Sequence, residues 1–382
     1  NGTILGTIYT QGLRSCPSVR DDGREAVFVN DEGQIMLLTL EYAPNGTITP
    51  TVDVLEDQPI WHNTAISKDG RYVAFTTEER DNLIYIYDFV AQKEKVFDLY
   101  NPTYTEGQIT GDVQYSDVIE FDYSGEYLMY DAYNELNNGQ TLSYWDIGFL
   151  QFWGNGAFAD PADAFISKLF SGIPENTSIG NPAIAKNSPY IIAFDFIDES
   201  GATVLNDVYC ANVETGDYGI VVSGNTGLGW PNFTRTDHAL IYERPSSSAV
   251  SNLRLQGLAA SKIAPQGSST AFINNRRWGV WYANGTRSLE VGTEEPSARQ
   301  LNLSVSPNPA NDLTRLTLTT EESESARLSI TNLLGETLQN RIVELQPGSN
   351  QFDLDLTSLP VGMYVVHLHT GKAQGAIVVV KR

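Results

Sequence analysis

The sequence predicts an all-β protein, a six-bladed β-propeller followed by a seven-stranded Ig-like β-sandwich. In residues 1–292, a short strand that ends on an aromatic residue recurs six times at intervals of 39 to 64 residues. In residues 300–382, seven short segments alternate between apolar and polar residues. A single unit of such a repeat cannot bury both of its apolar faces, whereas a closed ring of units buries all of them.

The clearest unit of the repeat is residues 63–88, NTAISKDGRYVAFTTEERDNLIYIYD. Its first strand ends at the polar turn SKDG, its second ends on an aromatic residue, and a third alternating strand follows an acidic turn. The aromatic residues that end the second strands are Phe28, Phe75, Tyr130, Phe194, Tyr242 and Trp281. The first strands carry an apolar residue near the turn, namely Val19, Ile66, Phe121, Ile184, Phe233 and Phe272. A recurring aromatic position is what packing between blades requires.

The beginning of the chain predicts how the ring closes. Residues 3–10 (TILGTIYT) form a strand that belongs to none of the six units, while the sixth unit supplies only about three strands, at residues 269–275, 277–282 and 286–291. We expect the N-terminal strand to complete the sixth blade. The alternative is that this strand finishes the last blade of a domain that precedes Asn1.

The turn SKDG, the following strand that ends on Phe75 and the strand IYIYD together resemble the TolB-type, WD40-like propeller family. The resemblance extends over about residues 12–292. It is found again in the first and third units (DDGREAVF and YSGEYLMY) and fades in the sixth, which has no turn glycine. The resemblance implies a ring-shaped propeller.

Composition and charge narrow the class of protein. The chain has 382 residues, of which 41% are hydrophobic and 19% charged, which is ordinary for a globular protein with two or three domains. The chain has 47 acidic and 24 basic residues. Residues 299–382 hold 8 of the acidic and 7 of the basic residues, so residues 1–298 hold 39 acidic and 17 basic residues, a net charge of −22. Such a surface repels phosphate backbones, so no nucleic-acid partner is expected. The charge either keeps the protein soluble in a salty or extracellular medium or attracts cations and basic partners.

No transmembrane segment is expected, because the sequence has no apolar run of about 18 residues. It also shows neither an initiator Met nor a signal peptide, so we expect Asn1 to be a processed or truncated N-terminus with any targeting segment upstream. Cys16 and Cys210 fall in the first and fourth units, on opposite sides of the ring. A disulfide requires Cα atoms within about 7 Å, so two separate thiols are expected.

The composition changes after residue 292. Residues 293–299 are polar, contain a proline and show no periodicity, which predicts a linker between a propeller at 1–292 and a second domain at 300–382. The seven predicted strands of the second domain are residues 301–306, 313–319, 326–331, 336–343, 351–356, 363–369 and 375–381. Seven short alternating strands separated by turn residues favour an Ig-like sandwich.

Four motifs in the second domain, VSPNPA, NLLGETL, LPVGMYVVHL and a final strand that ends VVVKR, resemble the type A C-terminal sorting domain of the bacterial type IX secretion system. The signature residues of that family fall on Pro307, Asn308, Pro309, Gly335, Gly362, Tyr364, Lys381 and Arg382. The resemblance implies recognition by the outer-membrane translocon and a secreted or cell-surface location, reached through the periplasm and the outer membrane. The alternative is a binding or spacer domain.

Catalytic motifs are absent from the sequence. It contains no G-x-S-x-G, H-E-x-x-H, Walker loop or C-x-x-C. His367 and His369 have the spacing of metal ligands on one face of a strand, but no third ligand is in sight, and the sequence leaves a metal site undecided. Glycosidases need two carboxylates about 5 to 9 Å apart. The acidic propeller could supply such a pair in its funnel.

Propeller topology predicts one candidate binding surface. The loops that enter the first strands and the loops that join the second and third strands open on the same side, which we call the entry face. The first set of loops contributes the candidate binding residues Trp61, His62, Asn63, Asp117, Asn181 and Trp230. The second set contributes a rim of carboxylates, Asp31, Glu32, Glu78, Glu79, Asp131, Glu135, Asp195, Asp198 and Glu243, with Asp131 and Asp195 as further candidate binding residues. No cofactor motif is present, and Ca²⁺ is the ion that such a rim would suit.

Three functional hypotheses follow. The first, and the one the sequence favours, is an exported, non-catalytic module that binds an extracellular protein, peptide or glycan on its entry face. The second is a carbohydrate-active enzyme with carboxylates in the propeller funnel. The third is that the chain is the accessory region of a larger secreted protein whose active domain precedes residue 1.

Overall fold

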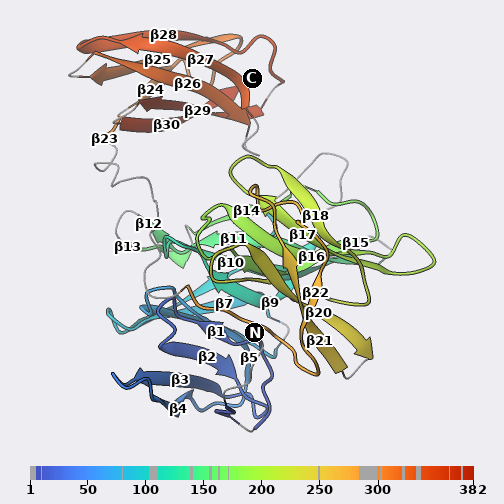
Figure 1. Ribbon diagram of the computed structural model, residues 1–382. Coiled ribbons are helices and arrows are strands. Elements are labelled where there is room, and N and C mark those ends of the chain that lie inside the picture. Colours follow the sequence, from blue (N-terminus) through green and yellow to red (C-terminus); the bar gives the residue numbers. More distant parts are fainter. Residues whose placement is uncertain are drawn as a thin grey trace. The chain divides into compact units, whose positions relative to one another are not determined.

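The computed structural model describes two compact units, residues 1–289 and 290–382. The residues outside the description are 1–5, 10, 80, 103–110, 138–140, 155–156, 162–163, 171, 248–249, 284–298, 302, 321–322, 333–336, 361 and 371–372. Strands account for the regular structure of both units (Figure 1). Within the described residues, no helix has the length and apolar character needed to cross a membrane.

The described residues of the first unit form five four-stranded antiparallel sheets, the blades of a propeller (Figure 1). The first sheet consists of β1 (Ser18–Val19), β2 (Glu25–Val29), β3 (Ile35–Tyr42) and β4 (Ile48–Glu56). The second consists of β5 (Trp61–Ile66), β6 (Tyr72–Thr77), β7 (Leu83–Asp88) and β8 (Lys93–Asp98). The third sheet is β9 (Asp112–Phe121), β10 (Tyr127–Asn137), β11 (Thr141–Gln151) and β14 (Phe165–Lys168), with the small ribbon β12 (Trp153–Gly154) and β13 (Ala157–Phe158) beside it in sequence. The fourth sheet consists of β15 (Thr177–Ile184), β16 (Ile191–Asp198), β17 (Leu205–Asn212) and β18 (Tyr218–Asn225). The fifth consists of β19 (Asn232–Phe233), β20 (Ala239–Ser247), β21 (Val250–Gly257) and β22 (Thr270–Ile273).

Apolar packing between neighbouring blades forms the core. Four buried clusters each combine residues of two consecutive sheets. The predicted aromatic positions Phe28, Phe75, Tyr130, Phe194 and Tyr242 are all at most 7% exposed. The repeat derived from the sequence is therefore confirmed for five blades.

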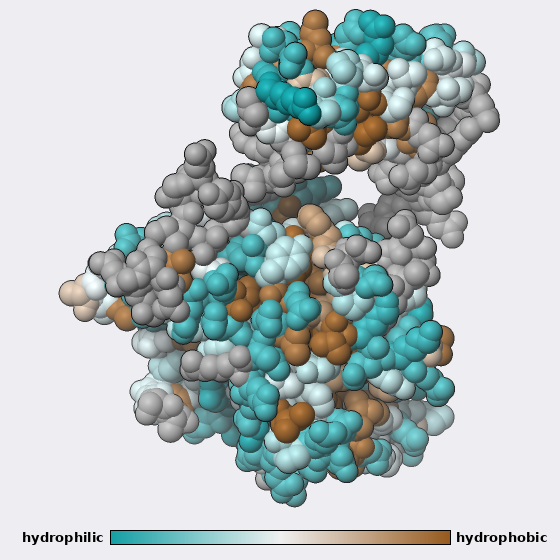
Figure 2. All heavy atoms as spheres, turned by 180° about the vertical axis from the view of Figure 1, so that it is seen from behind, coloured by the Kyte–Doolittle hydropathy of each residue, from teal (hydrophilic) through white to brown (hydrophobic). Residues whose placement is uncertain are grey.

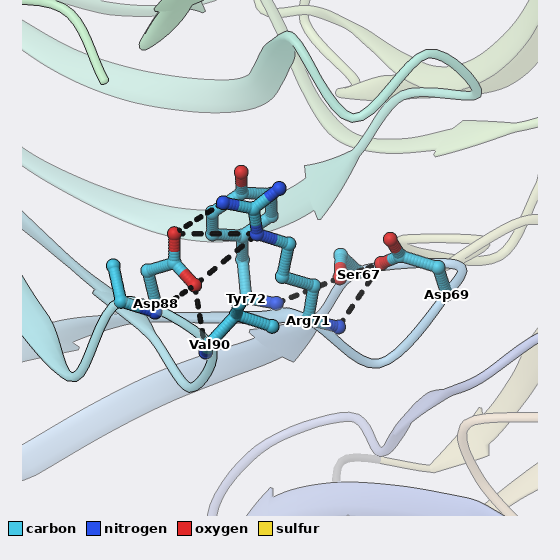
Figure 3. A network of polar contacts seen from close by, with 7 residues as sticks. Ser67, Asp69, Arg71, Tyr72, Asp88 and Val90 are labelled. Atoms are coloured by element: carbon cyan, nitrogen blue, oxygen red, sulfur yellow. Dashed lines mark hydrogen bonds and ion pairs between the residues drawn. The ribbon is translucent and has the colours of Figure 1, made fainter. Parts of the chain in front are cut away.

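The turn that marks each unit is best seen at residues 67–70 (Figure 3). The Ser67 hydroxyl donates to Asp69 Oδ1 (2.6 Å) and accepts from the backbone N–H of Tyr72 (2.9 Å). Asp69 Oδ1 also accepts from the N–H of Arg71 (3.0 Å), and the guanidinium of Arg71 binds the carboxylate of Asp88 at the end of β7 (2.8 Å). The motif thus joins the first three strands of its blade, which explains its pattern in the sequence.

The sixth unit differs from the prediction. Residues 270–273 are not the first strand of a sixth blade but β22, the fourth strand of the fifth sheet. Trp281 does not end a second strand, because residues 277–283 contain no strand. Instead, Gly279, Val280 and Trp281 line the same central cavity as the first strands of the five blades. The described residues therefore give five complete blades and one further inner segment, and six four-stranded blades are not confirmed.

The N-terminal residues do not show the predicted closing strand. Residues 1–5 and 10 lie outside the description, and residues 6–9 are not in a strand. Tyr9 packs edge-to-face against Phe28 of the first blade, with the ring centroids 5.1 Å apart. Cys16 and Cys210 are both free, as predicted.

The second unit consists of two sheets. The larger has the order β23 (Arg299–Gln300), β30 (Ala373–Lys381), β29 (Gly362–Thr370), β26 (Glu324–Asn332) and β27 (Thr337–Leu345), and the smaller has β24 (Ser304–Ser306), β25 (Leu313–Thr320) and β28 (Gly348–Asp355). A single apolar cluster contains Leu316 and Leu354 of the smaller sheet and Leu328, Val366 and Val379 of the larger. The seven predicted strands are confirmed as β24 to β30, and β23 is an addition that pairs in parallel with β30.

The surface mixes polar and apolar side chains. On the side shown in Figure 2, hydrophobic residues occur in small groups between hydrophilic ones. Exposed large apolar side chains such as Val90 (74% exposed) and Phe165 (58% exposed) are widely separated in the sequence. Scattered apolar residues of this kind are normal for a protein surface.

The position of the sixth inner segment can be tested at Gly279. A Cβ atom there would lie 2.4 Å from Cδ1 of Ile241 in β20. We predict that Gly279→Val lowers the free energy of unfolding by about 1–3 kcal/mol, because it overpacks this contact. Gly201→Val is the control, since a Cβ atom at Gly201 has its nearest neighbour at 3.7 Å. Equal urea unfolding curves for the two variants would show that the segment does not pack on β20.

Candidate functional site

Three carboxylates predicted for the rim of the entry face are buried. Asp131, Asp195 and Glu243 directly follow the aromatic positions of the third, fourth and fifth blades, and their side chains belong to residues only 2%, 1% and 1% exposed. We call these three residues the inter-blade carboxylates. Their predicted place on a solvated rim was wrong, because each side chain turns toward the blade that follows.

Each inter-blade carboxylate accepts hydrogen bonds from the backbone of the next unit. Asp131 Oδ2 accepts from the N–H of Asn181 (2.8 Å), and Asp195 Oδ2 accepts from the N–H of Trp230 (3.0 Å). Glu243 Oε1 accepts from the N–H of Trp278 (2.7 Å). Buried backbone N–H groups need an acceptor, and each carboxyl group offers one at a fixed point, so these contacts fix how consecutive units sit against one another.

The three donor residues share an unusual backbone conformation. Asn181, Trp230 and Trp278 have φ angles of 51°, 43° and 50°, in the left-handed region that most residues avoid. Trp278 therefore corresponds to Asn181 and Trp230, which identifies residues 277–283 as the inner segment of a sixth unit. An acidic residue directly after the aromatic position is the sequence signal that could have revealed this role.

Burial alters the acidity of two inter-blade carboxylates. Burial raises the pKa of Asp195 to about 6, against the opposing effect of hydrogen bonds from Asn181, Gly229 and Trp230. Burial and the nearby charge of Asp117 raise the pKa of Asp131 to about 8. In an unfolded chain both groups would titrate near their ordinary value of about 3.9.

The other candidate binding residues divide into two groups. Trp61, Asn63 and Asn181 are buried, at 7%, 4% and 8% exposure, and serve the packing of the blades. Trp61, for example, stacks edge-to-face on Phe75 with the centroids 4.6 Å apart. His62, Asp117 and Trp230 are half-buried and remain in reach of solvent.

His62 and Asp117 form a contact between the second and third blades. His62 Nε2 lies 2.8 Å from Asp117 Oδ1, and the two side chains are 35% and 29% exposed. The hydrogen bond to Asp117 raises the pKa of His62, while partial burial opposes that effect. The structure thus brings together two candidate residues that are 55 positions apart in the chain.

The remaining rim carboxylates stay near the surface. Asp31, Glu32, Glu78 and Glu79 are exposed, and Glu135 and Asp198 are half-buried. In the part of the chain that the structure describes, no group of three or more His, Cys, Asp or Glu side chains is placed to hold a metal ion. Calcium binding by the rim stays a prediction.

A second cluster, which was not predicted, includes Glu120 and Lys186, two residues that line the central cavity of about 60 Å³. Glu120 Oε1 lies 2.5 Å from Nζ of Lys68 and 3.8 Å from Nζ of Lys186. Burial opposes the ionisation of Glu120, but the two ammonium groups outweigh it and lower its pKa to about 2. This cluster links the second, third and fourth blades by charge.

The signature residues of the second unit gather around the end of β30. The Lys381 ammonium is buried and donates to the carbonyls of Leu356 (2.6 Å) and Leu359 (2.7 Å). Asn308 Oδ1 accepts from the N–H of Val380 (2.9 Å). Segments that are about 70 residues apart in sequence thereby meet at one place in the domain.

The other signature residues lie close by, with one exception. The Tyr364 hydroxyl donates to the carbonyl of Pro360 (2.6 Å), and Gly362 pairs with Lys381 in the sheet. The carbonyl of Pro307 accepts from the Thr314 hydroxyl (2.7 Å). Pro309 directly precedes Ala310, and the N–H of Arg382 donates to the Ala310 carbonyl (2.9 Å). The exception is Gly335, which lies outside the described residues.

Residues 304–381 match the family model described as the secretion system C-terminal sorting domain. The second unit is a type IX sorting domain. The protein is therefore exported by the type IX secretion system, through the periplasm and outer membrane, to the cell surface or the medium. The translocon of that system is the partner of the sorting domain.

The sequence has no significant match among curated proteins. Similar solved structures include TolB from Acinetobacter baumannii (TM-score 0.41, 16% identity, 64% of this chain and 51% of that chain) and a putative TolB from Agrobacterium tumefaciens (0.38, 12%, 81% and 95%). Cobalt-substituted ACO from Synechocystis is also similar (0.37, 13%, 69% and 62%). The chain thus spans about half the length of the Acinetobacter protein.

The role of Asp195 leads to a prediction about stability. Asp195→Asn leaves at least one of three donors without an acceptor, so we expect a loss of about 1–3 kcal/mol in unfolding free energy. The difference in unfolding free energy between the wild type and Asp195→Asn should shrink as the pH rises from about 4 to 6. In this range Asp195 keeps its proton in the folded wild type and loses it in the unfolded chain, which lowers the stability of the wild type. Asp198→Asn, on the same strand but half-buried, is the control. Denaturant titrations at several pH values would contradict the assignment if both variants behaved alike.

Lys381 provides a test of the sorting domain. Lys381→Met removes the buried ammonium from its backbone carbonyls and should destabilise the domain by about 2–3 kcal/mol. Hydrogen exchange of residues 348–382 in the full chain should accelerate accordingly. Arg382→Met, at an exposed position, should have little effect. Unchanged protection in Lys381→Met would mean that the contacts of Lys381 do not stabilise the domain.

Proposed function

We propose that the exported propeller is a non-catalytic binding module whose ligand, a protein, peptide or glycan, docks on the entry face. The observation that carries this proposal is that some polar residues of that face are bound within the protein and others reach solvent. The inter-blade carboxylates are occupied by backbone N–H groups, whereas His62, Asp117 and Trp230 remain in reach of solvent.

The alternative of a glycosidase finds less support in this arrangement. General acid and base catalysis needs carboxyl groups that can reach the substrate. Asp131 and Asp195 are buried, and each joins its own blade to the next one. Their raised pKa values are therefore explained by burial at a structural position. Perturbed acidity alone is not evidence of catalysis, because structural networks also produce it.

The type IX sorting domain supports an extracellular setting for the ligand. A module that is delivered to the cell surface or the medium meets proteins and polysaccharides there. The half-buried indole of Trp230 and the imidazole of His62 beside Asp117 suit partners with mixed polar and apolar surfaces. If the chain is part of a longer protein, the propeller would be the accessory module that attaches the active domain to this ligand.

A binding screen with matched variants tests the proposal. The full chain should bind members of a glycan array or a library of extracellular proteins and peptides, without turning them over. Trp230→Ala and His62→Ala should each weaken binding by about tenfold, the loss of one good contact. Tyr190→Ala removes an aromatic side chain that is 48% exposed at the opposite face of the propeller, and should leave binding unchanged.

Two results would contradict the proposal. One is turnover of a bound glycan that disappears in Asp117→Asn, which would favour the enzyme. The other is equal loss of binding in all three variants, or in Tyr190→Ala alone, which would place the ligand elsewhere.

A further inference from the structure

A pocket lies where the fifth blade meets the inner segment at residues 277–283. It has a volume of about 230 Å³ and is lined by Leu228, Trp230, Glu243, Pro245, Ser247, Val250, Ser251 and Arg277. These residues come from the loop that enters β19, from the ends of β20 and β21 that meet at their connecting turn, and from the inner segment. The pocket therefore belongs to the entry face.

Arg277 is held in place at the mouth of this pocket. Its Nε donates to Oε2 of the buried Glu243 (3.2 Å), and its guanidinium carbon lies 4.9 Å from the ring centroid of Trp278. The side chain is nevertheless 51% exposed. In the part of the chain that the structure describes, its two Nη groups have no hydrogen-bond partner. A guanidinium fixed in this way loses little freedom when it binds an acceptor with two oxygens.

The charge around the pocket is opposite to that of the domain. Glu243 is the only acidic residue among the lining residues, and Arg277 already neutralises it. Arg276, whose N–H binds the Ser251 carbonyl (3.0 Å), is also exposed, whereas Arg244 lies on the opposite face of β20 from the lining residues Glu243 and Pro245. Glu243, Arg277 and the neighbouring Arg276 together carry one positive charge, in a propeller with a net charge of −22 over residues 1–298. The pocket therefore suits an anion, not the cation expected from the overall composition.

The pocket favours a singly charged group on a small ring. A dianion such as phosphate would lie close to the buried Glu243, whereas a carboxylate carries one charge and matches the two Nη groups of Arg277. A cavity of about 230 Å³ is smaller than the 300–1,000 Å³ that drug-sized ligands occupy, so it fits a single unit of a chain. The half-buried indole of Trp230 offers an apolar face on which a sugar ring can pack, and Ser247 and Ser251 make part of the lining polar.

We propose that this pocket binds a carboxylate-bearing sugar unit, a hexuronate, of an acidic polysaccharide, with Arg277 as the residue that pairs with the carboxylate. This inference rests on the proposed function and names the ligand class for the entry face. The polysaccharide would run outward from the pocket over Arg276. Binding should weaken as salt screens these charges.

The experiment uses the full chain and calorimetric titration with an oligogalacturonate at low salt. The matched ligand is the same oligosaccharide with its carboxylates methyl-esterified, which keeps the sugar and removes the charge. Arg277→Gln should weaken binding of the acidic form by about tenfold or more. Arg277→Lys, which keeps a positive charge beside Glu243, should fold normally and bind between the two. Arg24→Gln removes a side chain that is 61% exposed in the first blade, and should bind as the wild type does.

The outcomes separate this inference from the proposed function. No binding of the acidic oligosaccharide, equal binding of the esterified form, or wild-type affinity in Arg277→Gln and Arg277→Lys would each overturn the hexuronate assignment. So would preferential binding of a peptide with a free C-terminal carboxylate. In every one of these cases the binding module itself would stand if another ligand from the array still depended on His62 or Trp230. Thermal unfolding of each variant confirms that the comparison is made between folded proteins.

Discussion

The packing of one sheet against the next is the interaction on which the propeller depends. Apolar contact is strong but has no direction, so it does not by itself fix how two sheets are aligned. The inter-blade carboxylates supply that direction, since each one accepts N–H groups at a defined point of the following unit. Burying a carboxylate is unfavourable, and the two or three donors at each site offset only part of that cost, so the pKa values of Asp131 and Asp195 stay raised.

The same arrangement explains how the ring continues beyond its fifth complete blade. Glu243 binds the N–H of Trp278 just as Asp195 binds that of Trp230. The inner segment at residues 277–283 is thereby held in the place of a first strand, although no strand among the described residues pairs with it. Its glycine at position 279 permits the close approach to Ile241.

Much of the fold could be predicted because its signals are local. The aromatic positions from Phe28 to Tyr242 and the seven strands of the sorting domain follow from periodicity and turn residues alone. The sixth unit could not be assigned correctly, because the strand at residues 270–273 has the same apolar pattern whether it begins one blade or ends another. Only its pairing with β21 decides between the two.

The candidate site was harder to predict for a related reason. Topology placed Asp131, Asp195 and Glu243 at the correct end of their strands, but a sequence does not show which way a side chain turns. Their partners are the backbone N–H groups of residues in a left-handed conformation. The residue types do not reveal this conformation, since an asparagine (Asn181) and two tryptophans (Trp230 and Trp278) adopt it. By contrast, the proximity of His62 and Asp117 follows from the shared entry face of neighbouring blades.

The position of β30 in the sorting domain has a consequence for the order of events in the cell. This strand lies inside the larger sheet, between β23 and β29, and its Lys381 secures the loop at residues 356–359. A ribosome makes β30 after every other strand of the domain. The export signal therefore takes shape only once the propeller and the rest of the domain have been synthesised, and a chain that stopped short of β30 would not present the complete surface that marks cargo for passage through the outer membrane.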